Sequence, residues 1–416
     1  MSADRVAEIH RLIAEQMAGL PQQTHDPARG LPLQVTGFGA EEVSAMVDVL
    51  LSTWVTMGKQ VRAFESEWAE WCGAEQGIMV NSGSSANLIA LAALVQAGRL
   101  QPGDEVLVPA VAWSTSLFPV AQSGLVPVLV DVDPSNLCLT PEIARAHMGP
   151  RTKAAVAVHL LGQPVDVEGL QALGLIVIED ACGAHGAEIG GRRVGAIGEV
   201  GTFSFFFSHH ITTVEGGVVT LSDPELADTA RSLRAHGWIR ERSDKDTLAE
   251  AHRPIDPRFL FVSAGWNLRP TEMAAAMGRI QLQRLGPWLA RRRANHRAWC
   301  ELLAPFSEQI SVWPELPGTR HAAFAFPMMI REGVDFSRAE FMAHLESRQI
   351  ATRPISGSNL ARQPAAAHVP GLQIRGDLAV ADAVHERGLF VGNSHAFGEG
   401  HGQLLVGAIQ EFLHER

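Results

Sequence analysis

The chain has 416 residues, which is enough to bury a large core. This length also suffices for two domains that share a core. Its formal net charge of -11 excludes general nucleic-acid binding, which needs a basic face, although one arginine or one helix end could still hold a phosphorylated small molecule. Its four cysteines are scattered, so they indicate no zinc site, no iron–sulfur cluster and no disulfide framework.

Residues 1–30 are predicted to form an N-terminal helical segment. Asp4, Arg5, Glu8 and Arg11 lie among apolar positions there, as in an amphipathic helix. A signal peptide would need an apolar central run, and no uncharged stretch of the chain approaches the length of a membrane span. We therefore expect a soluble cytoplasmic protein that does not bind membranes.

Short apolar runs then recur within a predicted large α/β domain over residues 31–290. Most are apolar on consecutive positions, which is typical of strands that are covered on both faces. Helix-like segments such as "SSANLIALAALVQAG" lie between them, and this alternation indicates a mostly parallel sheet that binds ligands beyond the carboxyl ends of its strands. The runs include "EVLVPA", "VPVLVDVD", "AAVAVHLLG", "LIVIEDA", "GTFSFFF" and "GGVVTLS".

The pattern changes after about residue 270. A long helical stretch follows, in which Leu282, Leu285 and Leu289 lie near helical spacing. The segments "HAAFAFPMMI", "SRAEFMAHLESRQI" and "ATRPI" then predict a smaller α+β domain with its own sheet, over residues 291–416.

The segment "NSGSSAN" is a candidate phosphate site, because a Gly/Ser turn there connects a strand-like run to an apolar helix. The free N–H groups and the partial positive charge of a helix N-terminus attract phosphate. Gly83 would let a ligand approach the backbone, and Ser84 and Ser85 would add hydroxyl donors. Taken alone, such a segment is more often an ordinary serine N-cap without a ligand.

Two further residues follow buried strands, where an α/β sheet contacts its ligands. Asp180 in "LIVIEDACGAHG" could hold a protonated pyridine nitrogen, or it could cap the segment that follows it. Trp113 in "PAVAWSTS" could stack on a flat ring, although a tryptophan is more often part of the core.

Taken in order, these segments resemble the DegT/StrS family of vitamin-B6-dependent sugar aminotransferases and dehydratases, from about residue 30 nearly to the end. The resemblance implies a fold-type I, aspartate aminotransferase-like α/β architecture whose large domain binds pyridoxal phosphate. In the family's motifs, Gly83, Ser84, Ser85 and Ser204 would contact the phosphate, Trp113 the ring face and Asp180 the ring nitrogen.

The stretch "GWNLRPTEMAAAMGRIQL" resembles the family's subunit-interface signature. Asn267 in this stretch would reach the cofactor phosphate of the neighbouring subunit, so the resemblance implies a homodimer with a shared active site.

In most of the family, a lysine that bonds covalently to the cofactor occupies the position of His209 in "FSFFFSHH". Imidazole cannot form that stable bond, so the resemblance implies pyridoxal or pyridoxamine phosphate without a lysine linkage. His209 could still move protons in catalysis. We do not expect a metal site at His209 and His210, because neighbouring strand residues face opposite ways and no nearby residues complete a ligand set.

A histidine at this position marks a branch of 3-dehydratases that act on nucleotide-linked 4-keto-6-deoxy sugars. Residues 236–270 contain no cysteine, which excludes the iron–sulfur type, and "TRPISGSN" and "GLFVGNSH" resemble the cluster-free type that acts on GDP-4-keto-6-deoxymannose. The resemblance implies glutamate as amino donor and a 3,6-dideoxy-4-keto sugar as product, a lyase reaction of dideoxysugar biosynthesis for lipopolysaccharide O-antigen.

Other features leave the substrate open. Arg240 and Arg353 could grip a diphosphate through paired donors, or they could be surface ion-pair partners. Gly183 stands where the family usually has a polar residue, and Trp266 where it usually has tyrosine. The alternatives are an aminotransferase or dehydratase for another keto substrate and a non-catalytic cofactor-binding regulator, and Asp180 and His209 argue against the latter.

Overall fold

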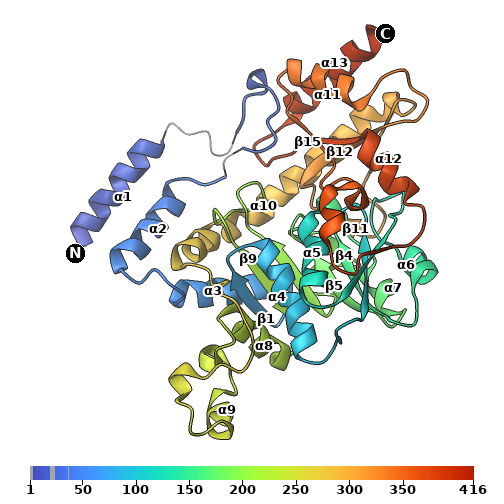
Figure 1. Ribbon diagram of the computed structural model, residues 1–416. Helices are drawn as coiled ribbons and strands as arrows, with labels where there is room; N and C mark the ends of the chain where they lie inside the picture. The colour runs from blue at the N-terminus through green and yellow to red at the C-terminus, as the bar shows by residue number, and fades with distance from the viewer. Residues whose placement is uncertain (1–2, 19–23, 36) are drawn as a thin grey trace.

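The computed structural model describes residues 3–18, 24–35 and 37–416. Its centre is an eight-stranded sheet in which one internal strand, β9, runs antiparallel to both of its neighbours and the other neighbouring pairs are parallel (Figure 1). The predicted α/β class with a mostly parallel sheet is confirmed. In spatial order the strands are β1 (Gln76–Val80), β9 (Gly217–Leu221), β8 (Val200–Ser204), β5 (Ile176–Asp180), β4 (Thr152–Val158), β2 (Glu105–Pro109), β3 (Val126–Val130) and β14 (Gln373–Ile374).

Helices cover this sheet because its central strands are apolar on both faces. Helix α4 (Gly83–Gln96) lies against β8 and β9, and ten of its residues are buried, so it belongs to the core over most of its length. The uninterrupted apolar runs of the sequence therefore correspond to strands enclosed by helices. The others around the sheet are α3 (Lys59–Cys72), α5 (Ser114–Gln122), α6 (Pro141–His147), α7 (Val167–Gln171) and α8 (Pro224–Arg234).

The C-terminal part of the chain builds a second, antiparallel sheet with a core of its own, as the sequence predicts. Leu31, which precedes the large sheet, pairs with Ile350 and belongs to this second core. The strands in spatial order are β10 (Ile310–Ser311), β12 (Ala325–Ile330), β15 (Gly388–Gly392) and β13 (Thr352–Pro354), and the helices are α11 (Arg338–Ser347), α12 (Ala379–Arg387) and α13 (Glu399–His414).

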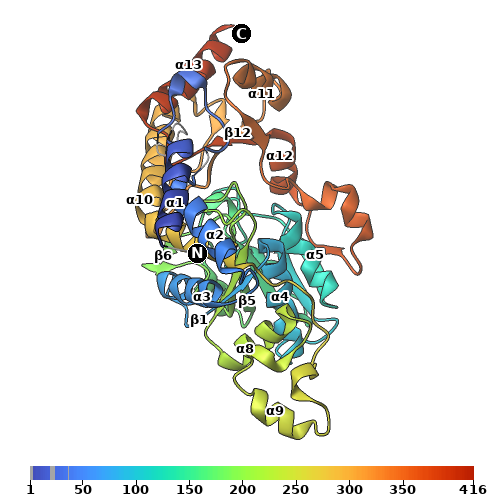
Figure 2. The same ribbon diagram turned by 90° about the vertical axis from the view of Figure 1, so that its left-hand side faces the viewer.

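Helix α10 (Glu272–Leu303) connects the two parts, running from the large sheet toward α13 (Figure 1 and Figure 2). It packs against α2 (Ala40–Ser52) and α3. Helix α1 (Ala3–Met17) lies beside α2 within the predicted N-terminal helical segment, and none of its residues is buried. None of the helices within the described residues is long and apolar enough to cross a membrane.

Smaller elements complete the fold. A three-stranded sheet joins β11 (Thr319–Arg320), β6 (Glu188–Ile189) and β7 (Arg192–Arg193). The chain between α8 and α10 extends away from the large sheet and carries the short helix α9 (Lys245–Ala251), seen at the bottom of Figure 1.

Glu272 joins α10 to the start of α3. Its buried carboxylate accepts hydrogen bonds from the backbone N–H groups of Gly58 (2.8 Å), Gln60 (2.9 Å) and Val61 (2.8 Å). Because Glu272→Ala leaves these donors without a partner, we expect the free energy of unfolding to fall by about 3 kcal/mol in urea titrations. Glu272→Gln keeps one acceptor oxygen and should lose less, and Glu301→Ala on the exposed face of α10 should change little. An equal loss in all three variants would contradict this role.

Candidate active site

A cavity of about 800 Å³ opens at the carboxyl ends of β4, β5 and β8. Its wall is formed by segments that are far apart in the sequence, from the chain before α2 to the β13 region. Several sequence-predicted site residues lie together in its wall, namely Gly83, Ser84, Trp113, Asp180, Ser204, His209 and Arg353.

The N-terminus of α4 forms one wall. Ser82 is the N-cap, and its hydroxyl accepts a hydrogen bond from the N–H of Ser85 (3.1 Å). A side chain at Gly83 would lie 2.5 Å from Cβ of Ser204, so only glycine lets the turn pack against the end of β8. Ser84 faces the cavity, whereas the hydroxyl of Ser85 donates to Asn81 (2.6 Å) within the cap and Ser85 does not line the cavity.

Asp180 is the last residue of β5 and is only 6% exposed. One of its carboxylate oxygens accepts hydrogen bonds from Asn87 Nδ2 (2.9 Å) and Ser116 Oγ (2.7 Å), and the other accepts from the N–H of Cys182 (3.2 Å). Asp180 therefore supports the next turn, as a capping carboxylate would. It also faces the cavity, where it could meet a ligand.

Trp113 directly precedes α5 and lies at the rim of the cavity, where it is 60% exposed. It is therefore not a core residue in this chain. Its position leaves an aromatic face available to a flat ligand at the cavity wall.

His209 lies on the loop between β8 and β9 and lines the cavity. Its Nδ1 is buried without a hydrogen-bond partner among the described residues. Burial lowers the pKa of His209 to about 4, opposed in part by the negative charge of Asp180. The ring is therefore neutral at pH 7 and can accept a proton.

His210 does not line the cavity. Its Nε2 hydrogen-bonds to the carbonyl oxygen of Ala322 (3.0 Å), and its ring is buried. No group of three or more His, Cys, Asp or Glu residues suited to a metal ion occurs in the part of the chain that the structure describes.

Residues 37–410 match the DegT/DnrJ/EryC1/StrS aminotransferase family. The chain belongs to this family. It is 35% identical over 371 residues to GDP-4-keto-6-deoxy-D-mannose 3-dehydratase from Yersinia pseudotuberculosis, a match that covers 87% of this chain and 93% of that protein.

Solved structures show the same fold. A variant of GDP-4-keto-6-deoxymannose 3-dehydratase with bound GDP-perosamine superimposes with a TM-score of 0.85 at 32% identity, covering 91% of this chain and all of the other. That dehydratase with a trapped PLP–glutamate geminal diamine gives a TM-score of 0.83 at 31% identity, covering 91% of this chain and 100% of that one. The expected aminotransferase-type fold and family are thus confirmed.

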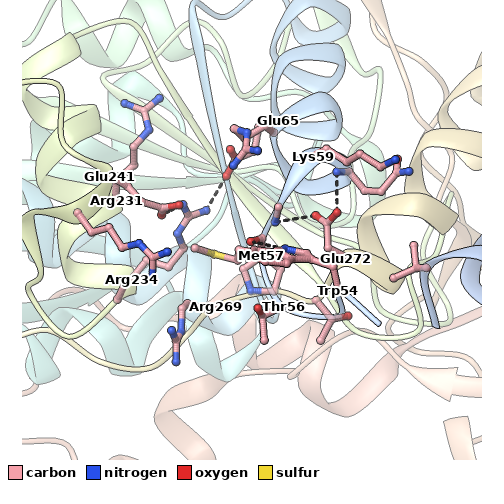
Figure 3. A pocket seen from close by; sticks show the side chains of 18 of the residues that line it. Trp54, Thr56, Met57, Lys59, Glu65, Arg231, Arg234, Glu241, Arg269 and Glu272 are labelled. Atoms are coloured by element: carbon pink, nitrogen blue, oxygen red, sulfur yellow. Dashed lines mark hydrogen bonds and ion pairs between the residues drawn. The ribbon is translucent and has the colours of Figure 1, made fainter. Parts of the chain in front are cut away.

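Two predicted residues of this DegT-family chain lie elsewhere. Asn267 and Arg240 line a second cavity, of about 1040 Å³. Figure 3 shows Arg269 and Glu272, which also lie in the wall of this cavity. Asn267 Oδ1 accepts a hydrogen bond from Arg269 Nε (2.9 Å), and the Arg240 guanidinium lies 5.3 Å from the ring centre of Trp238. Within one subunit these residues are therefore separate from the cavity that contains His209.

Several residues of the site were not predicted from the sequence. Asn87 lies one helical turn after Gly83, and Ser116 lies three residues after Trp113, so the helical period was a usable signal for both. Gln34 and Phe324 gave no such signal, because they reach the cavity from distant parts of the chain.

The glycine at position 183 leaves open space in the cavity wall. A Cβ atom there would have no neighbour closer than 4.0 Å, the distance to Leu161 N and to the ring of Phe324. The cavity therefore has room for a larger side chain at this position. Where the resemblance to the family implies a polar side chain, this chain has empty space.

Proposed function

We propose that this chain is a 3-dehydratase of a nucleotide-linked 4-keto-6-deoxy sugar that uses pyridoxal or pyridoxamine phosphate, not linked to lysine, with glutamate as amino donor. The observation that carries this proposal is the position of His209, a neutral imidazole in the cavity formed by Asp180 and the N-terminus of α4. The likeness to 3-dehydratases at 35% and 32% identity supports it.

The residues present fit such a cofactor. Ser84, Ser204 and the free N–H groups of α4 would hold the phosphate, and Asp180 would keep the pyridine nitrogen protonated. Trp113 would cover the ring. When bound, the cofactor supplies an amine that condenses with the C4 ketone and a ring that takes up electrons.

His209 is the proton carrier in this proposal. As a neutral imidazole it would accept a proton from the C4′ carbon of the bound cofactor, and as an imidazolium it would donate that proton to the departing C3 hydroxyl. Phe206, Leu161 and Phe324 give the surrounding wall an apolar character, which restricts water around this transfer.

Arg353 is the candidate for the diphosphate of the substrate. It lines the same cavity from β13, its side chain is exposed, and among the described residues no carboxylate lies within 4.0 Å of it. Its Nη1 donates to the backbone oxygen of Thr352 (2.7 Å), and the other donors of its guanidinium would bind phosphate oxygens.

Asn267 and Arg240 would act across a homodimer. Cations outnumber carboxylates in the cavity that they line, which suits a surface facing the phosphate groups of a neighbouring active site. We accordingly propose a shared active site, to which Asn267 contributes in trans.

The direct test incubates the protein with pyridoxal phosphate, glutamate and GDP-4-keto-6-deoxymannose and analyses the products by mass spectrometry. A nucleotide sugar lighter by one oxygen, together with ammonia and 2-oxoglutarate, is the expected result. A new amine on the sugar would instead indicate an aminotransferase, as the family name allows. Cofactor binding without turnover of any keto sugar would indicate a non-catalytic regulator.

The pH dependence gives a second test. Because His209 must be neutral to accept a proton and burial lowers its pKa to about 4, we expect kcat/KM to stay level from pH 8 to pH 6 and to fall only below that range. Steady-state rates in buffers of constant ionic strength measure this. An acid limb centred at or above the ordinary histidine value of about 6.5 would contradict the buried neutral base.

A further inference from the structure

Arg292 on α10 carries a charge that no acidic residue compensates. Its side chain is fully buried, and no carboxylate of residues 3–18, 24–35 and 37–416 lies within 4.0 Å of it. The chain's other fully buried arginine side chain among those residues, Arg234, pairs with Glu65 and Glu241. Burying an unpaired cation is costly, so Arg292 is not explained by stability alone.

The contacts of Arg292 lead to His209 by two routes. Its Nη2 donates to Gln34 Oε1 (3.3 Å), and Gln34 Nε2 donates to the backbone oxygen of His209 (3.4 Å). Its Nη1 donates to the carbonyl oxygens of Phe324 (3.1 Å) and Asn393, and the Phe324 ring centre lies 5.3 Å from that of His209. One guanidinium thus supports two residues that contact His209, Gln34 at its backbone oxygen and Phe324 beside its ring, and both line the cavity.

The charge of Arg292 also acts on the imidazole. It opposes a second positive charge on His209, in the same direction as burial, and Asp180 acts in the opposite direction. The positive charge of Arg292 also lowers the pKa of His185 and His210, for each of which burial is the larger cause. The titratable or charged groups around the His209 ring are therefore Asp180 from β5, His185 from the turn after it, the adjacent His210, and Arg292 from α10. His159, Cys182, Glu215 and Arg353 lie in the same cavity wall.

We propose that Arg292 is a positioning residue for His209, which holds Gln34 at the backbone oxygen of His209 and Phe324 beside its ring and places an uncompensated positive charge near the imidazole. The inference rests on the proposed role of His209 as the proton carrier. Arg292 is not among the residues that line the cavity, so it acts through its neighbours.

The test is an NMR titration of histidine-labelled full-length protein without substrate, with the His209 signal assigned by its loss in His209→Asn. Arg292→Met removes the charge, and we expect the His209 titration midpoint to rise by about one pH unit. Arg292→Lys keeps the charge and should leave the midpoint near the wild-type value. Arg293→Met is the matched control, because Arg293 pairs with Glu315 and should not affect His209. An unchanged midpoint in a folded Arg292→Met protein overturns the inference.

Gln34→Leu tests the bridge separately and covers the case in which Arg292→Met does not fold. We expect kcat for deoxygenation to fall about tenfold with KM unchanged, because the support of His209 is lost while the substrate contacts remain. An unchanged kcat overturns the inference. Since the titration needs no substrate, a shifted midpoint in a protein that deoxygenates no sugar would refute only the proposed function. An unmoved midpoint in an active dehydratase would refute only the role of Arg292.

Discussion

In a His209→Lys variant we expect pyridoxal phosphate to become covalently attached to the chain, and deoxygenation at C3 to fall by at least about 100-fold. A lysine amine bonds to the aldehyde of the cofactor, whereas an imidazole does not. Position 209 lies in the wall of the cavity that contains Asp180, so an amine there would meet the bound cofactor. Borohydride reduction followed by mass spectrometry of the denatured protein would reveal the added cofactor mass.

His209→Asn is the matched control for this experiment. It removes the proton carrier without providing an amine, so we expect lost deoxygenation and no added mass. The wild-type chain should also release its cofactor on denaturation. If the lysine variant remained unmodified while still binding pyridoxal phosphate, the assignment of position 209 to the reacting carbon would be wrong.

The second large effect is expected for Asp180→Asn. The amide keeps the size of the side chain and can still accept the hydrogen bonds of Ser116 and Asn87, but it cannot balance a protonated pyridine nitrogen. We expect kcat to fall by at least about 100-fold and the cofactor to be held more weakly, since the ring loses both its ionic partner and its capacity to take up electrons.

Equilibrium dialysis with pyridoxal phosphate and product analysis by mass spectrometry measure the two effects separately. Asp166→Asn is a suitable control, because Asp166 caps α7 at a site outside the cavity. Full activity of Asp180→Asn would mean that another residue holds the ring nitrogen.

Local sequence patterns identified Gly83, Asp180 and Trp113 as candidates, but they left open an ordinary N-cap, a capping carboxylate and a core tryptophan. A glycine at a strand-to-helix turn, a carboxylate at a strand end and an aromatic residue after a strand are recognisable within about ten residues, and parallel strands bring such ends to one edge. The contrast between Ser84 and Ser85 was not predictable, because it depends on which hydroxyl the cap uses.

Distant contacts were outside the reach of those patterns. Gln34 precedes the large sheet by 42 residues and Arg292 lies on the connecting helix, and neither belongs to a recognisable motif. Arg240 and Arg353 were alike as candidate diphosphate ligands, yet the fold places only Arg353 in the cavity with His209.

The sequence by itself determined the α/β class, the candidate residues at the strand ends and the histidine at position 209, because each depends on residue type and local spacing. The tertiary structure decided which of these side chains share a cavity and that Asp180 is held by Asn87 and Ser116. It also decided that Arg292 is buried near His209 with no acidic partner among the described residues. The reason is physical: burial and electrostatic environment are set by the packing of segments far apart in the chain, and no local pattern encodes that packing.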